Sequence, residues 1–496
     1  LTGVHFEIGI MLGLGGVVLC SFLGGMRAIT WTQVAQYVIL LLAFLVPVSW
    51  LAYQQLGNPL APLAYGKQLE KIAALEKKLQ ASPQEQEVQA EFQARARQYQ
   101  RWLQDVEGSL REQRTLAQER VRELVAQNAP VERVVAARRA LSALPRDSAE
   151  AREQWARAMK DSQDRSRFLG GLPPHTQAYV GDPNGSEAER QAFQSSRANF
   201  LALMFCLMVG TAGLPHLLTR YYTTPSVATA RASVAWSLFF IALLYLSAPA
   251  LATLVKYELM QNVVGSHFNA LPSWIAQWSH YDDSLLSVRD INGDGILQFG
   301  EIRLGADLIM LATPELGGMP YVVSGLVAAG GLAAALSTAD GLLLTISNSL
   351  VRDTYLQEFG RHVAPEQRVI LSKFALLSVA TVAAFVASLR PAEILPLVAS
   401  SFSLAASALV PAMVMGIFWS RTTGAAAVAG MLAGLSVTVG YMVLNAPAVR
   451  AVLRLPAGQS LWFDIQPVSA AVFGVPLGFA VILVLSVLTR RRVAGA

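Results

Sequence analysis

Nine segments of about 20 or more predominantly apolar residues run through this chain of 496 residues, and they constrain its fold more than any other feature. Segments of this length match the hydrocarbon thickness of a bilayer. Inside lipid, only helices and closed barrels satisfy the backbone polar groups. The sequence therefore predicts an all-α, multi-spanning membrane protein. The predicted spans are residues 7–26, 30–53, 198–221, 232–255, 320–350, 367–389, 393–419, 423–445 and 467–489, with a tight turn at 24–31 joining the first two.

Charged residues are concentrated in one part of the chain. Between residues 61 and 200 lie 22 of the 39 Lys and Arg residues and 19 of the 34 Asp and Glu residues. The two signs are mixed, so the basic residues form no patch for nucleic acid. We interpret residues 58–197 as a charged insert outside the membrane, helical and arranged as a hairpin or small coiled coil. A poorly ordered spacer is the alternative.

The spans and the insert together predict five regions and an orientation. The arginines at 490–492 place the C-terminus in the cytoplasm, because short cytoplasmic segments are rich in Lys and Arg. Three arginines contradict this arrangement: Arg390, Arg450 and Arg454. The predicted regions are residues 1–57 with two spans, 58–197 with the extracytoplasmic insert, 198–255 with two spans, 256–319 with an extracytoplasmic loop, and 320–496 with five spans. The membrane would be a cell membrane, inner or plasma.

Residues 330–348 carry a polar stripe through an apolar span. On a helix, Ala334, Ser337 and Thr338 share one face, and Thr345 and Asn348 continue it. Small and hydroxyl residues on such a face also serve helix packing. Asp340 favours a functional interpretation, because a carboxylate in mid-bilayer is expensive and usually marks an ion or proton pathway.

Four motifs in order resemble the sodium/solute symporter family, and particularly its acetate-permease-like branch, which moves small monocarboxylates. They are "GGMRAITWTQ" from residue 24, "GTAGLPHLLTRYYT" from 210, "AAALSTADGLLLTISNSLVRDTY" from 333 and "FWSRTTGAAAVAGMLAG" from 418. The resemblance covers nearly the whole chain except the insert. It implies a fold of two inverted five-helix repeats, present here only in part, with substrate and ion sites at mid-membrane beside broken helices.

The resemblance also implies site residues. Ala334, Ser337 and Thr338 match one half of the family's sodium site. The other half belongs to the first core helix, which we expect to precede residue 1, so that the sequence is N-terminally truncated. Many relatives have Asp in place of Gln33, where it contributes to an additional cation site. Asp340 and Gln33 are therefore the predicted second cation or proton site, unless Asp340 is simply protonated and hydrogen-bonded.

Two glycines and a proline predict a helix break that exposes backbone groups to substrate: Gly210, Gly213 and Pro215.

The sequence "DINGDGILQFGE" at 290–301 fits the twelve-residue EF-hand loop position by position. The predicted calcium ligands are Asp290, Asn292, Asp294, Ile296 through its carbonyl, Gln298 and Glu301. A turn that keeps this shape without metal is the alternative. An extracytoplasmic site would stay filled and would act as a structural clip.

The sequence thus predicts a secondary active transporter rather than an enzyme: sodium-coupled symport of an acetate-like monocarboxylate by alternating access. A membrane solute sensor and an ion channel are the alternatives. Sodium is the expected coupling ion and calcium a structural one. The expected partners are the substrate and the lipid bilayer, with no nucleic acid, and a small membrane companion subunit is a further candidate.

Overall fold

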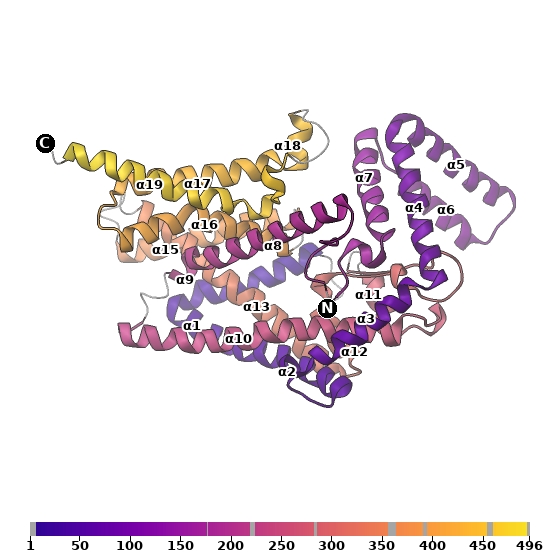
Figure 1. Ribbon diagram of the computed structural model, residues 1–496, viewed down its shortest axis with the longest axis horizontal. Coiled ribbons are helices and arrows are strands. Elements are labelled where there is room, and N and C mark those ends of the chain that lie inside the picture. Colours follow the sequence, from indigo (N-terminus) through magenta and orange to yellow (C-terminus); the bar gives the residue numbers. More distant parts are fainter. Residues whose placement is uncertain are drawn as a thin grey trace. The chain divides into compact units, whose positions relative to one another are not determined.

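The computed structural model describes residues 6–175, 177–218, 224–281, 285–355, 364–389, 394–453 and 460–493. The chain divides into two compact units (Figure 1). Unit 1 contains Leu1–Trp50, Tyr179–Ala248 and Gly317–Ala496, and unit 2 contains Leu51–Ala178 and Pro249–Leu316. The prediction of an all-α, multi-spanning membrane protein is confirmed, because the described residues include eight helices long and apolar enough to cross a bilayer.

The long helices follow the apolar segments, because lipid-facing positions must stay apolar for the length of a crossing. Their bounds are α1 Phe6–Leu56, α8 Glu187–Gly213, α10 Val227–Glu258, α13 Tyr321–Asn348, α15 Pro365–Ser388, α16 Ile394–Phe418, α17 Gly424–Leu444 and α19 Ala471–Val493. Short helices accompany them: α9 Pro215–Leu218 and α18 Pro447–Val452.

The predicted tight turn at residues 24–31 is wrong, because α1 is one continuous helix of 51 residues. Two adjacent glycines weaken a helix without ending it, and the first proline of α1 is Pro47. A straight helix of this length measures about 77 Å, whereas the hydrocarbon core measures about 30 Å. The number of crossings in this segment therefore stays a prediction.

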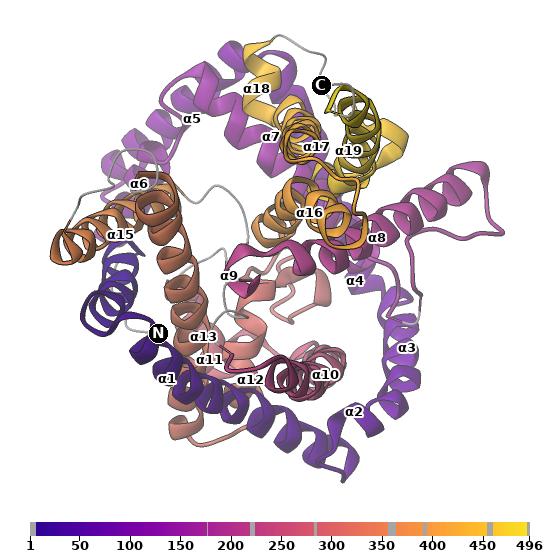
Figure 2. The same ribbon diagram turned by 90° about the vertical axis from the view of Figure 1, so that its left-hand side faces the viewer.

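Unit 1 is built around four packed helices, α8, α16, α17 and α19 (Figures 1 and 2). Small residues let their backbones approach closely. A Cβ on Gly434 would lie 2.5 Å from the carbonyl oxygen of Ser407, so only glycine fits there. Buried hydroxyls link the same helices, since Thr438 donates to Ser407 Oγ at 2.7 Å. Small and hydroxyl residues at helix contacts are typical of proteins that pack in lipid.

Unit 2 contains the insert up to Ala178 and the segment that connects α10 to α13. The insert forms helices α2 Ala61–Ala64, α3 Gly66–Gln80, α4 Pro83–Gln104, α5 Val106–Ala126, α6 Val131–Ser142 and α7 Ser148–Arg165. Helices α4, α5 and α7 share an aromatic core in which the rings of Trp102 and Trp155 lie 5.1 Å apart. Helix α4 begins at Pro83, where the missing N–H of proline leaves no donor unsatisfied.

The connecting segment of unit 2 holds the described β-structure. Strands β1 Leu286–Val288 and β2 Ile302–Leu304 pair antiparallel, with Ser287 opposite Arg303, and the loop 290–301 lies between them. Helices α11 Ser273–Tyr281 and α12 Ile309–Leu316 flank this hairpin in the sequence.

Of the arginines that bear on orientation, Arg390 and Arg454 and the side chains at 490–492 lie outside the described residues. Arg450 is buried, and its guanidinium donates to Ser460 Oγ at 3.2 Å. Its guanidinium is therefore held by contacts within the protein. The cytoplasmic position of the C-terminus stays a prediction.

Candidate functional site

The polar face of α13 arranges its hydroxyl groups around one backbone carbonyl. Ser337 Oγ donates to the carbonyl oxygen of Ala334 at 3.0 Å, and Thr338 Oγ1 donates to the same oxygen at 3.2 Å. Ser337 is half-buried and Thr338 is exposed. Because each hydroxyl uses its only proton on that carbonyl, its lone pairs remain available. The face therefore offers neighbouring oxygen ligands of the kind that hard cations prefer.

Helix α1 meets this face at Gln33. The Nε2 of Gln33 donates to the backbone carbonyl of Ser337 at 2.8 Å. Asp340 follows Ser337 by three residues, on the same side of α13, and only 1% of it is exposed. Asp340 also has an interaction partner of its own. Gln33 thus contacts α13 at Ser337, one helical turn before the buried Asp340.

The two helices can approach because α13 has Gly330 at the next contact. A Cβ there would overlap the Cβ of Ala43 and would lie 3.7 Å from the carbonyl oxygen of Ile39. Contacts at Gln33 and Ala43 mark one stripe of α1, and Gln36 lies on that stripe between them.

Gln36 is a residue that the sequence reasoning missed. Its Oε1 is shielded from solvent and has no hydrogen-bond partner among the described residues. A buried amide oxygen without a hydrogen bond can accept one from a donor group or a water, or can coordinate a cation. The available signal was a second glutamine one turn after Gln33, because two amides at this spacing lie on one face of a membrane helix.

The predicted helix break is present in the structure. Helix α8 ends at Gly213, Leu214 is extended, and α9 begins at Pro215 (Figure 1). The two glycines also have a packing role. A Cβ on Gly210 would lie 2.5 Å from the carbonyl oxygen of Phe402, and one on Gly213 would lie 2.9 Å from that of Ala405. Close contact with α16 therefore accounts for both glycines, whether or not substrate binds at the break.

In unit 2, the loop 290–301 folds around its own carboxylates. Asp290 accepts from the N–H of Gly293 at 2.7 Å and from that of Gly295 at 3.1 Å. Both glycines have positive φ, of 77° and 73°, which favours glycine over other residues. Glu301 reaches back across the loop and accepts from the N–H of Ile291 at 2.6 Å and of Gln298 at 3.0 Å.

Backbone N–H groups of the loop hold these carboxylates in place, but the carboxylates do not form a cluster. Among the described residues, no group of three or more His, Cys, Asp or Glu side chains is close enough to hold a metal. Gln298 is nevertheless 6% exposed, and its Oε1 has no hydrogen-bond partner within the described part of the chain. Its Nε2 donates to Asp294 Oδ2 at 2.8 Å. The oxygen-rich side chains of this loop, including this buried oxygen of Gln298, are of the ligand type that calcium prefers.

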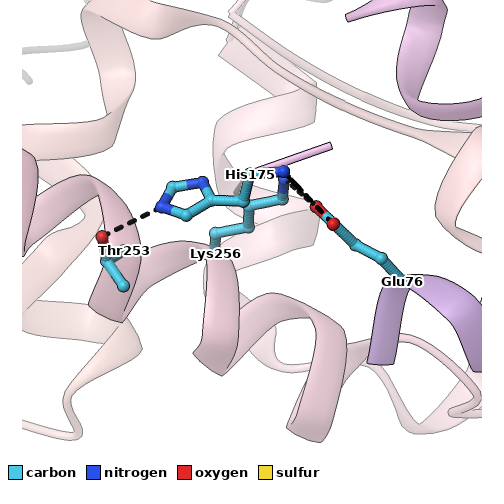
Figure 3. Close-up of polar contacts among 4 residues, drawn as sticks. All are labelled: Glu76, His175, Thr253 and Lys256. Carbon is cyan, nitrogen blue, oxygen red and sulfur yellow. Dashed lines mark hydrogen bonds and ion pairs between the residues drawn. The ribbon is translucent and has the colours of Figure 1, made fainter. Parts of the chain in front are cut away.

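A buried polar cluster joins the insert to the end of α10 (Figure 3). Lys256 Nζ pairs with Glu76 Oε1 at 2.6 Å, and both carboxylate oxygens accept from the backbone N–H of His175, at 3.1 and 3.2 Å. The Nε2 of His175 lies 3.1 Å from Thr253 Oγ1. Because the Thr253 hydroxyl donates to the carbonyl of Pro249, the proton in the His175 contact belongs to Nε2. Burial is the main cause that lowers the pKa of His175, with Lys256 adding to it.

Comparison with known proteins points to one family. The pattern of the Sodium:solute symporter family matches residues 311–434, which include the whole of α13. An uncharacterized symporter of Cupriavidus necator is 48% identical over 491 residues, 99% of this chain and 70% of that protein.

More distant relatives bear transporter names. A monocarboxylic acid transporter of Corynebacterium glutamicum is 27% identical over 51% of this chain and 40% of its own length. The high-affinity proline transporter of Bacillus subtilis is 32% identical over 24% of this chain and 25% of its own length. The similarity to the first relative is close and nearly continuous, whereas the others share only parts of the chain.

Proposed function

The chain belongs to the sodium:solute symporter family, and from this membership we propose that it carries out sodium-coupled symport of a small organic anion, an acetate-like monocarboxylate. The observation that carries the proposal is the arrangement of Ser337 and Thr338, whose hydroxyls both donate to Ala334 and keep their lone pairs free for an ion. The substrate class is supported by the relative named a monocarboxylic acid transporter. Transport would proceed by alternating access at mid-membrane.

Uptake of labelled acetate into proteoliposomes tests this proposal. An inward sodium gradient should drive accumulation, and replacing sodium by potassium should abolish it. Ser337→Ala or Thr338→Ala should each raise the sodium concentration for half-maximal uptake. Thr381→Ala is the matched control, because this exposed hydroxyl on α15 also donates to a backbone carbonyl, that of Leu377. Unchanged sodium dependence in both α13 variants would refute the assignment of the sodium face.

The same assay separates the alternatives. A channel would let acetate equilibrate but never accumulate against its gradient. A sensor would bind the solute without net flux. The proposal also includes a small membrane companion subunit and a cytoplasmic C-terminus.

The side on which the C-terminus lies can be tested with a cysteine introduced near the arginines at 490–492. A membrane-impermeant thiol reagent added outside the cell should not label a cytoplasmic cysteine.

We further propose that Asp340 and Gln33 form a second cation or proton site. The contact of Gln33 with the Ser337 carbonyl supports their proximity, and the burial of Asp340 supports a role beyond solvation. Asp340→Asn should reduce coupled uptake, and adding Gln33→Asp should partly restore it, because the carboxylate then returns from α1. If the double variant is no better than Asp340→Asn, the two residues do not share a site.

Finally, we propose that the loop 290–301 binds calcium as a structural clip. The unsatisfied Oε1 of Gln298 and the positive-φ glycines support this, and an affinity of about 10⁻⁴–10⁻³ M is expected for an extracellular module. When bound, the ion would be held by the six predicted ligands and would offset most of the negative charge of their three carboxylates. Glu301→Gln should lower thermal stability in calcium but not in chelator. Equal melting of both proteins in calcium would contradict the site.

A further inference from the structure

The insert and the loop 290–301 lie far apart in sequence, yet unit 2 brings them into direct contact. Glu85, near the start of α4, accepts from the backbone N–H of Gly300 through both oxygens, at 3.0 and 3.3 Å. The contact is close enough that a Cβ on Gly300 would lie 3.1 Å from both Glu85 Oε1 and Val88 Cγ1. Gly300 immediately precedes Glu301, which occupies the last ligand position of the loop.

Two further contacts hold the insert on the hairpin that carries the loop. From α7, Arg165 donates to Ser287 Oγ of β1 at 3.2 Å, and Asp161 pairs with Arg303 of β2 at 2.8 Å. Arg165 also lies over the ring of Phe92, on α4, at 5.3 Å. Both strands therefore contact α7, the loop between them contacts α4, and Arg165 joins the two helices.

Glu85 is an unusual residue for such a contact. Only 2% of it is exposed, although it carries a carboxylate, and burial is the main cause that raises its pKa, with the neighbouring Glu301 adding to it. The acceptor that Gly300 requires could be supplied by a glutamine, which would carry no charge into the interior. A buried anion beside the carboxylate of Glu301 costs stability unless a cation accompanies it.

We propose that Glu85 is an outer anionic partner of the calcium ion in loop 290–301, so that calcium fastens α4 of the insert onto the loop. The proposal rests on the calcium site proposed above. The second observation that points to a ligand is Gln298, which is more than nine-tenths buried and whose Oε1 lacks a partner among the described residues. Calcium affinity rises with the number of charges around the site, and outer partners tune it further.

The coupling must act in both directions. If Glu85 strengthens calcium binding, then calcium strengthens the docking of α4 by the same factor. Outer partners of metal ligands typically change affinity by about 10- to 100-fold. We therefore expect Glu85→Gln to weaken calcium binding at least about tenfold, and calcium to slow amide exchange of residues 83–104 in the unmodified protein by a similar factor.

The experiment compares three forms of the full chain in detergent, with calcium chloride as the probe and calorimetry and hydrogen exchange as readouts. Glu85→Gln keeps one oxygen for the Gly300 N–H and removes the charge together with the longer of the two hydrogen bonds. Glu87→Gln is the matched control, because this exposed acid lies on the same helix and removes the same charge. Weaker binding in Glu85→Gln and unchanged binding in Glu87→Gln would support the proposal.

Two results would overturn it. If the unmodified protein binds no calcium, the calcium site itself fails and the fastening fails with it. If calcium binds, but Glu85→Gln and Glu87→Gln bind it with equal affinity, the site stands and the role of Glu85 is refuted. A calcium effect on exchange that survives in Glu85→Gln would likewise exclude this residue as the link.

Discussion

The buried ion pair of Lys256 and Glu76 allows a quantitative test of how the insert is attached (Figure 3). The Glu76 side chain is 4% exposed and the Lys256 side chain is 23% exposed. Lys256→Met would leave the carboxylate buried with only the His175 N–H as its donor. Removing one partner of a buried pair costs about 3–5 kcal/mol. Because Lys256 is partly exposed and solvent screens the pair, we expect a smaller cost, about 2–3 kcal/mol.

This magnitude converts directly into a hydrogen-exchange signal. Opening of α3 should become about 30- to 150-fold more frequent, since each 1.4 kcal/mol is a factor of ten. The double variant Glu76→Gln with Lys256→Met should recover most of the loss, because a neutral pair leaves no unpaired buried charge. The exposed pair of Arg120 and Glu123 is the control, and Arg120→Met should change stability by less than about 1 kcal/mol.

Two outcomes would refute this reasoning. A change below about 0.5 kcal/mol in Lys256→Met would mean that water already solvates Glu76. Additive effects in the double variant would mean that the two side chains do not interact energetically, whatever their separation.

Three further predictions concern stability. Gly330→Ala should destabilise unit 1 by about 1–3 kcal/mol, because its Cβ would overlap α1, whereas Gly325→Ala, which faces open space, should be neutral or stabilising on denaturant unfolding. Burial lowers the pKa of His175 in the folded protein, so folding favours the neutral imidazole. Thermal stability should therefore be greatest above the ordinary pKa of about 6.5 and should decline as pH falls from there through the lower folded pKa. His175→Gln should remove this part of the pH dependence. Tyr441→Phe should cost about 1–3 kcal/mol in thermal unfolding, because the buried hydroxyl donates to Ile465 and accepts from Trp462.

The membrane helices were predictable because lipid imposes one requirement along about 20 successive residues, which a sequence displays directly. Local backbone chemistry was readable as well. Pro215 follows the end of α8, and Gly293 and Gly295 take the positive φ that a tight loop needs. The turn predicted at 24–31 failed because glycine permits a turn without requiring one.

Contacts between distant segments left no comparable signal. Gln33 donates to a backbone carbonyl 304 positions away, and any residue could have supplied that acceptor. Glu85 stands in an insert whose acids are mostly solvated, so nothing in its own neighbourhood marks it as the buried one. Only the packing of α4 against Gly300 distinguishes it. Which distant residues come into contact depends on the three-dimensional fold, and hydrophobic periodicity does not predict it.

For the calcium site that we propose, the contacts of unit 2 favour a structural clip over a switch. A switch needs two arrangements of similar free energy, between which the ligand chooses. Here Glu301 accepts from the backbone N–H groups of Ile291 and Gln298, and these bonds hold the last ligand position of the proposed site in one arrangement. The same unit is fastened independently at Lys256, whose contact with Glu76 requires no ion. An insert held at both places resists opening as one body, and the proposed calcium site would add to the stability of unit 2.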